Sequence, residues 1–185
     1  MMKEVVDWVK SIIIAVVVAL LISQFVRGTT VYNTSMYPNI LPKDLVIIVK
    51  TITPERGDIV SFKSEINLTK RDIEGLSPFK RLFVSEKSKK NLIKRVIGLP
   101  GDKVDVQDGK VYINDELFVE DYIDVETFGD VHIDNIPDGK LFVMGDNRPV
   151  SLDSRDERVG LIDQGKIIGK AVFRIFPFNR IGTLH

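Results

Sequence analysis

The chain has no cysteine and only two histidines, His132 and the terminal His185, among its 185 residues. The missing cysteines exclude disulfide bonds, thiol catalysis and cysteine-ligated metals. Two isolated histidines argue against a histidine-based metal site and against a Ser-His-Asp triad. The chain also lacks net charge, because 26 basic residues balance 26 acidic ones. Composition therefore indicates no polyanionic partner such as nucleic acid.

Although the net charge is zero, the charged residues are unevenly distributed. Residues 63–95 contain ten basic and four acidic side chains, whereas residues 101–163 contain six basic and seventeen acidic ones. Such blocks are usually solvated faces of a folded domain. Alternatively, the basic stretch rests on anionic lipid head groups.

Residues 8–26 form a hydrophobic stretch that is entirely apolar from Ile12 to Ile22. As a helix it would be roughly 28 Å long, close to the thickness of a bilayer core. A cleavable signal peptide would end in small residues, whereas this stretch runs into Gln24-Phe25-Val26-Arg27. A buried core helix would be amphipathic. We therefore predict an uncleaved membrane anchor, whose orientation the flanking charges leave open.

After Arg27 the sequence is typical of a mainly antiparallel β domain. Short runs rich in β-branched residues recur at residues 45–49, 58–62, 92–97, 141–144 and 167–175. Residues 104–113 alternate apolar and polar side chains around Asp108-Gly109, which predicts a two-residue hairpin turn. Residues 65–90 fit this pattern poorly and indicate an inserted segment that is partly helical or mobile. We predict a transmembrane anchor within residues 1–27, followed by a β-sheet or barrel-like domain over residues 28–185. A variable basic insert would occupy about residues 64–91 of that domain.

Ser35 and Lys94 are the candidate reactive pair. A serine nucleophile needs a base, and a lysine can supply it if burial lowers its pKa from about 10.4. Ser35 follows Val26 by nine residues, so an extended link keeps it within about 32 Å of the anchor. Taken alone, Ser35 is typical of a polar turn before Pro38, and Lys94 is typical of an ordinary strand-edge lysine.

A third cluster of polar residues occupies residues 144–155, where Asp, Arg and Ser alternate densely. Burying these groups is costly unless they pair. A solvated loop is one alternative, and a metal site built on Asp146 and Asp153 is another. The absence of a nearby histidine, together with the arginines that already supply positive charge, argues against a metal.

Together, these motifs resemble those of bacterial type I signal peptidases (leader peptidases), in the compact single-anchor form common in Gram-positive bacteria. The resemblance covers nearly the whole chain and rests on the anchor, on Ser35-Met36-Tyr37-Pro38, and on residues 56–60, 94–102, 144–155, 160–162 and 169–174. It implies a membrane-bound serine endopeptidase with the signal peptidase type of β fold. It also implies that the enzyme needs no cofactor and no metal.

The resemblance implies a role for each site residue. Ser35 would be the nucleophile, Lys94 its base, and Ser151 a hydrogen-bonding partner that orients the lysine. Met36 would pack beside the nucleophile and wall the substrate pocket. The backbone N–H of Ser35 and the side chain of Asn33 would stabilise the oxyanion, although serine or glycine is more familiar than Asn33 there. Asn39 is a second departure, since threonine usually follows the proline. The residues that would support the site structurally are Arg95, Asp146, Arg148, Asp153 and Arg155.

The substrates implied are signal peptides of secreted preproteins, cut after small residues in Ala-x-Ala-like sites. The enzyme would act in the cell membrane, downstream of the protein export channel. Its N-terminus would be cytoplasmic and its catalytic domain extracytoplasmic.

Three other protein classes are alternatives that fit the sequence less well. Self-cleaving repressor proteases share the Ser-Lys chemistry, but they carry a DNA-binding domain for which residues 1–27 leave no room. A membrane-tethered binding domain that has lost catalysis would tolerate changes at Ser35 or Lys94, yet every reactive position here is filled. A general secreted hydrolase does not fit an uncleaved anchor.

Overall fold

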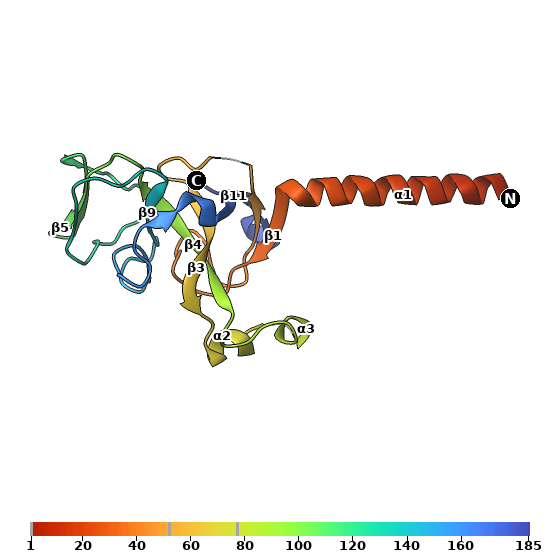
Figure 1. Cartoon of the computed structure of the whole chain (residues 1–185), viewed down its shortest axis with the longest axis horizontal. Helices are drawn as coiled ribbons and strands as arrows, with labels where there is room; N and C mark the ends of the chain where they lie inside the picture. Colours follow the sequence, from red (N-terminus) through yellow and green to blue (C-terminus); the bar gives the residue numbers. More distant parts are fainter. Residues whose placement is uncertain (1, 52, 77) are drawn as a thin grey trace.

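The computed structural model of the chain describes residues 2–51, 53–76 and 78–185. A long N-terminal helix leads into a β-rich domain that carries a small helical projection (Figure 1). The elements follow in the order α1 (Met2–Phe25), β1 (Val26–Thr30), β2 (Leu45–Val49), β3 (Ile59–Asn67), α2 (Lys70–Glu74), α3 (Pro78–Arg81), β4 (Lys89–Gly98), β5 (Val104–Gln107), β6 (Lys110–Ile113), β7 (Glu116–Leu117), β8 (Val131–Ile133), β9 (Lys140–Met144), β10 (Ile162–Asp163), the 3-10 helix η1 (Gln164–Lys166), β11 (Ile167–Phe176), the 3-10 helix η2 (Phe178–Arg180) and β12 (Gly182–Thr183). The predicted β fold with one N-terminal apolar helix is confirmed.

Helix α1 extends from the domain as an isolated rod (Figure 1). Its segment Glu4–Phe25 is long and apolar enough to cross a membrane, and its apolar stretch is not buried against the protein. Its 22 residues rise roughly 33 Å, which matches a bilayer core of about 30 Å. The helix begins earlier than the predicted stretch of residues 8–26 and ends at Phe25, because Val26 already pairs with a strand.

The junction between α1 and the domain is direct. Strand β1 pairs antiparallel with β2, from Val26 opposite Val49 to Thr30 opposite Leu45. Lys50 donates its backbone N–H to the Phe25 carbonyl (2.9 Å) and its Nζ to the Ser23 carbonyl (3.2 Å). Because strand pairing starts one residue after the helix ends, the direction of α1 is tied to the sheet.

Two antiparallel sheets form the domain. The larger has the order β1-β2-β11-β3-β4-β9-β10, with β12 beside β11, and the smaller has the order β7-β6-β5-β8. The hairpin of β5 and β6 turns at Asp108 (φ 51°) and Gly109 (φ 76°). Both residues adopt the left-handed backbone conformation that the favoured two-residue turn requires, and Asp-Gly adopts it at low steric cost. The predicted hairpin is confirmed.

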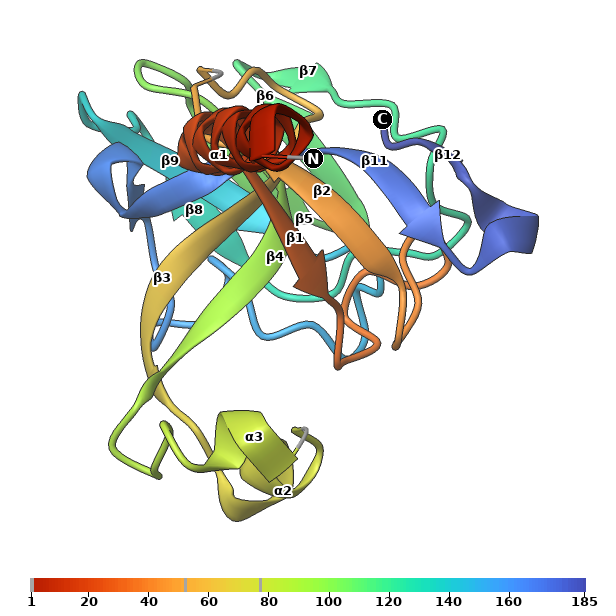
Figure 2. The same ribbon diagram turned by 90° about the vertical axis from the view of Figure 1, so that its right-hand side faces the viewer.

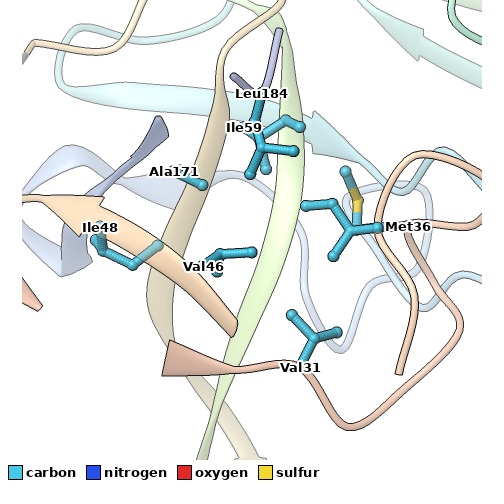
Figure 3. Packing of buried hydrophobic residues seen from close by; sticks show 8 residues of the cluster. Val31, Met36, Val46, Ile48, Ile59, Ala171 and Leu184 are labelled. Carbon is cyan, nitrogen blue, oxygen red and sulfur yellow. The ribbon is translucent and has the colours of Figure 1, made fainter. Parts of the chain in front are cut away.

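A cluster of buried apolar residues fixes the loop between β1 and β2. Val31, Met36 and Ile40 of this loop are at most 4 % exposed and pack with Val46, Ile48, Ile59, Ala171 and Leu184 (Figure 3). Each fully buried aliphatic side chain contributes about 1.5–3 kcal/mol. Three such anchors within ten residues hold the loop, and Ser35 with it, against the sheet.

Strands β3 and β4 extend beyond the body of the domain, with Asn67 opposite Lys89 at the end of their pairing. Helices α2 and α3 lie at the tip of this extension, apart from the other strands (Figure 2). The expectation that residues 65–90 are partly helical is thus met, although β3 and β4 reach farther into the segment than their sequence patterns predict.

Candidate active site

Ser35 and Lys94 meet at the centre of the site. Ser35 lies on the loop between β1 and β2, and Lys94 lies on β4, opposite Val60 of β3. Lys94 Nζ is 2.7 Å from Ser35 Oγ, within hydrogen-bonding distance. Ser35 is 8 % exposed and Lys94 is 1 % exposed. A hydroxyl and an amine at this distance can exchange a proton directly.

Burial controls the protonation of Lys94. Loss of solvent lowers the pKa of its amine from 10.5 to about 8. The negative charges of Asp153 and Asp146 oppose this effect, and the positive charge of Arg155 adds to it. At pH 8 about half of the molecules therefore carry a neutral amine, which can accept a proton from serine.

Asn33 also contacts the nucleophile, but with its oxygen. Asn33 Oδ1 accepts hydrogen bonds from Ser35 Oγ (2.9 Å) and from the Ser35 backbone N–H (3.4 Å). The resemblance implied a donor to the oxyanion at this position. In this structure the amide instead presents an acceptor, so donation requires Asn33 Nδ2 to turn toward the site.

Ser151 does not make the hydrogen bond to Lys94 that the resemblance implies. Its Oγ is buried and makes no hydrogen bond within the described residues, although it lies near enough to Asp153 to help lower the pKa of that carboxyl. The hydroxyl instead packs against Gly145, where an added Cβ would come within 2.2 Å of Ser151 Oγ and 2.5 Å of the Ser35 carbonyl oxygen. Ser151 is thus beside the site, without the predicted bond to Lys94.

Met36 follows the nucleophile but points into the core. It is 1 % exposed and belongs to the apolar cluster of Figure 3. The expectation that it packs near Ser35 fits this position, whereas a residue with so little exposed surface does not wall an open pocket. Its side chain stabilises the β1–β2 loop by packing into this apolar cluster.

The segment after β9 is fastened to the nucleophile loop through the backbone. Asn147 donates its N–H to the Ser35 carbonyl (3.0 Å), and its Nδ2 donates to the Thr34 carbonyl (3.0 Å). Gly145 donates its N–H to Asp153 Oδ2 (3.0 Å). These bonds align the two loops on either side of Lys94.

Buried ion pairs hold the same segment. Arg95 binds Asp146 through two bonds of 2.9 and 2.7 Å, and both side chains are at most 1 % exposed. Arg155 binds Asp153 through bonds of 2.9 Å. Burial raises the pKa of Asp153, but the hydrogen bond and charge of Arg155, together with the Gly145 N–H and the nearby Ser151 hydroxyl, bring that pKa below its ordinary value. Asp146 and Asp153, the alternative metal ligands of the sequence analysis, thus each bind an arginine.

Arg148 pairs with a residue outside the predicted set. Its guanidinium binds Glu120 and Thr127, and its Nε donates to the Gly145 carbonyl (3.0 Å). Glu120 lies in an acidic stretch without periodicity, so no sequence pattern marked it as a partner.

Asn39 and Tyr122 complete the support of the site and were also missed. Asn39 Nδ2 donates to Asp146 Oδ2 (2.8 Å) and to the Tyr122 carbonyl (2.9 Å). The Tyr122 ring lies 3.9 Å from the Arg95 guanidinium carbon, in a stacked cation–π contact. The only signal for Asn39 was its departure from threonine after the proline.

A cavity of about 460 Å³ adjoins the site at Ser151. Its lining consists of Phe128, Gly129, Arg148, Pro149, Ser151, Asp153, Arg155 and Asp156. Ser35 and Lys94 do not line it, so this cavity is not where a scissile bond would reach the nucleophile.

The Ser–Lys geometry fits more than one class of peptidase, and similarity over the whole chain distinguishes among them. The model of the family described as "Signal peptidase, peptidase S26" matches residues 5–176. The chain belongs to this signal peptidase family. Peptidase S26 is a family of serine endopeptidases, so the chain is a peptide-bond hydrolase of the type that removes signal peptides.

Two signal peptidases of Bacillus species align along almost the full length of this chain. A signal peptidase I of Bacillus licheniformis is 37 % identical, with 95 % of this chain and 90 % of that protein aligned. Signal peptidase I T of Bacillus subtilis is 35 % identical over 95 % of this chain and 87 % of its own length. A crystal structure of a signal peptidase I from Enterococcus faecalis covers 64 % of this chain and 97 % of its own, at 28 % identity and a TM-score of 0.47.

Proposed function

We propose that this chain is a membrane-anchored signal peptidase in which Ser35 and Lys94 form the catalytic dyad. The contact of 2.7 Å between Lys94 Nζ and Ser35 Oγ is the observation that carries the proposal. The lowered pKa of Lys94 supports it, because an amine with an ordinary pKa near 10.4 would be protonated at neutral pH and could accept no proton.

The reaction follows from the two groups. Ser35 Oγ attacks the scissile carbonyl carbon while the neutral Lys94 Nζ removes the hydroxyl proton. The Oγ–H proton now donated to Asn33 Oδ1 first turns toward Nζ. The resulting ammonium then protonates the leaving amine as the C–N bond breaks, leaving an ester on Ser35. A water molecule that gives its proton to Lys94 attacks this ester, and the ammonium returns the proton to Ser35 Oγ as the ester bond breaks.

The oxyanion of the tetrahedral intermediate needs preorganised donors. The backbone N–H of Ser35 is one candidate, because its present partner Asn33 Oδ1 lies at a weak 3.4 Å. Asn33 Nδ2 becomes a second donor if the amide turns by 180°. Ser151 keeps its proposed orienting role only after a change of rotamer, since its Oγ has no bond to Lys94 here.

The proposed enzyme is specific for substrates with small residues just before the scissile bond. Ser35 is 8 % exposed, so the nucleophile offers little open surface. Large side chains next to the scissile bond would collide with the protein before the carbonyl carbon reached Oγ. Signal peptides with Ala-x-Ala-like ends meet this demand.

The anchor gives the proposed location. Residues 1–27 would form a cytoplasmic tip and a single membrane span, and residues 28–185 an extracytoplasmic catalytic domain that acts on preproteins leaving the export channel. The 22 exposed, largely apolar residues Glu4–Phe25 support the span.

Cleavage of a preprotein tests the proposal. Detergent-solubilised full chain should cut a preprotein directly after its Ala-x-Ala sequence, as read from the mass of the mature product. Replacing the last alanine by tryptophan should abolish the cut. Equal cleavage of both preproteins would contradict the specificity, and no cleavage of either would contradict the function.

A further inference from the structure

Three large apolar side chains are exposed together at the tip of the β3–β4 extension. Phe79, Leu82 and Phe83 are 71 %, 78 % and 72 % exposed. Their spacing of three and four residues places them on one face of the turn formed by α3. The rings of Phe79 and Phe83 lie 5.2 Å apart, in edge-to-face contact. Single exposed apolar residues are ordinary, but a cluster at a protruding tip marks an interaction surface.

The tip is directed toward the side of the domain from which α1 leaves. In Figure 1, α3 projects to the same side as α1, at a distance from it across the domain. In Figure 2, viewed from that side, α1 is seen nearly end-on and α3 lies well below it. Because β1 pairs with β2 directly after Phe25, the helix cannot swing freely relative to the sheet that carries the tip. A bilayer crossed by α1 therefore faces α3.

The charge of the tip fits an anionic surface. Residues 68–88 contain five basic and three acidic side chains. Arg81 Nε donates to the Leu76 carbonyl (2.9 Å), and its guanidinium also binds the Glu74 carbonyl, which fastens α3 to the end of α2. Basic residues beside aromatic and leucine side chains are typical of segments that lie in the head-group region of a membrane.

We propose that Phe79, Leu82 and Phe83 insert into the interface of the phospholipid bilayer that α1 crosses. The inference rests on the membrane anchoring of the proposed function and adds a second contact point to it. One span leaves a domain free to tilt about its anchor. A second contact on the same side of the domain, at a distance from α1, fixes the tilt and hence the height of Ser35 above the lipid.

Fluorescence quenching by lipid tests this contact, because Trp8 is the single tryptophan of the chain. The double variant Trp8→Phe, Phe79→Trp places the reporter at the tip. Trp8→Phe, Leu82→Trp provides a second tip reporter in case the first variant misfolds. Trp8→Phe, Leu117→Trp is the matched control, since Leu117 is also exposed but lies on β7 of the smaller sheet. Each full-length protein is reconstituted into vesicles of phosphatidylglycerol and phosphatidylcholine, with or without acyl chains brominated near the head group.

The bromine should quench both tip reporters to an extent comparable with Trp8 of the wild type, and should leave the reporter at position 117 unquenched. Quenching of Trp8 without quenching at positions 79 and 82 would overturn the tip contact alone. A blue-shifted but unquenched tip reporter would indicate that the tip is covered by a second copy of the chain and would also overturn the lipid contact. Absence of quenching at Trp8 itself would instead contradict the membrane anchor of the proposed function.

Discussion

Lys94 Nζ and Ser35 Oγ lie 2.7 Å apart although the two residues are 59 positions apart in the chain. Two elements create this contact. The apolar side chains of the β1–β2 loop hold Ser35 against the sheet, and β4 brings Lys94 to it with both faces of the strand covered. The neighbouring Arg95 binds Asp146, whose loop in turn binds the Ser35 carbonyl through Asn147. The nucleophile and its base are therefore positioned by the same network.

The rate of cleavage should rise with pH through an apparent pKa near 8. Lys94 acts as a base only when neutral, and its pKa is lowered to about 8 by burial. Below that pH, each unit of acidification should lower kcat/KM about tenfold. Initial rates between pH 6 and 10 on a peptide without ionisable groups measure this; a flat profile would contradict a lysine base.

Replacing Lys94 by methionine should stabilise the folded chain at pH 7. The difference between the ordinary pKa of 10.5 and about 8 corresponds to roughly 3 kcal/mol of burial cost for the ammonium. The folded-state pKa is depressed, so the unfolded chain binds more protons between pH 8 and 10.5, and the stability of the wild type rises with pH in that window. Denaturant unfolding in detergent should show this rise in wild type and not in Lys94→Met. A less stable Lys94→Met protein would count against the account.

Gly145→Ala should impair catalysis, because the added methyl group would clash with the nucleophile loop and with Ser151. An added Cβ would lie 2.2 Å from Ser151 Oγ and 2.5 Å from the Ser35 carbonyl oxygen, so the nucleophile loop must shift. A displacement of about 1 Å costs on the order of 100-fold in rate. Gly165→Ala is the matched control, because no atom lies within 4 Å of its added Cβ. Similar rates for both variants would show that the loops tolerate the shift.

Asn39 should act as a positioning residue for Asp146. Asn39→Ala removes donors to the Asp146 carboxylate and to the Tyr122 carbonyl, and should cost about 1–3 kcal/mol of unfolding free energy. It should also lower kcat more than it raises KM, since Asn39 acts through Asp146 and makes no hydrogen bond to Ser35 or Lys94 among the described residues. Asn39→Thr keeps one hydroxyl donor and should recover part of both losses. Wild-type stability and kcat in Asn39→Ala would remove this residue from the network.

The sequence predicts features that depend on nearby residues. The strands at 45–49 and 141–144 and the Asp108-Gly109 hairpin follow from alternation and turn chemistry, and the structure confirms them. The extent of α1 was misjudged at its N-terminal end, because polar residues before Trp8 continue the helix without apolar periodicity. Strand β1 was missed, because Arg27-Gly28-Thr29 carries no strand pattern and pairs only through the neighbouring β2.

Within the site, residue types were predictable but their partners were not. Ser35 and Lys94 could be named because a hydroxyl and a base suit the chemistry and because their motifs resemble those of signal peptidases. Arg148 was expected among the ion pairs, but its partner Glu120 and the contact of Asn39 with Asp146 connect segments far apart in the chain. Charge patterns along a sequence do not specify such pairs, because the sequence contains many acidic residues and only the tertiary fold determines which of them lies beside a given arginine or amide. The amide orientation of Asn33 and the burial of Met36 likewise depend on tertiary packing.

The rate of cleavage by Lys94→Met tests most directly the central claim that Lys94 is the base for Ser35. The substitution preserves the volume of the buried side chain while removing the base, and unfolding experiments on the same sample show that it is folded. With a preprotein containing an Ala-x-Ala site, the dyad predicts a loss of about 10²–10⁴-fold or more in the rate of product formation relative to wild type. Cleavage by folded Lys94→Met at the wild-type rate would show that Ser35 does not depend on Lys94, and the account of this site would be wrong.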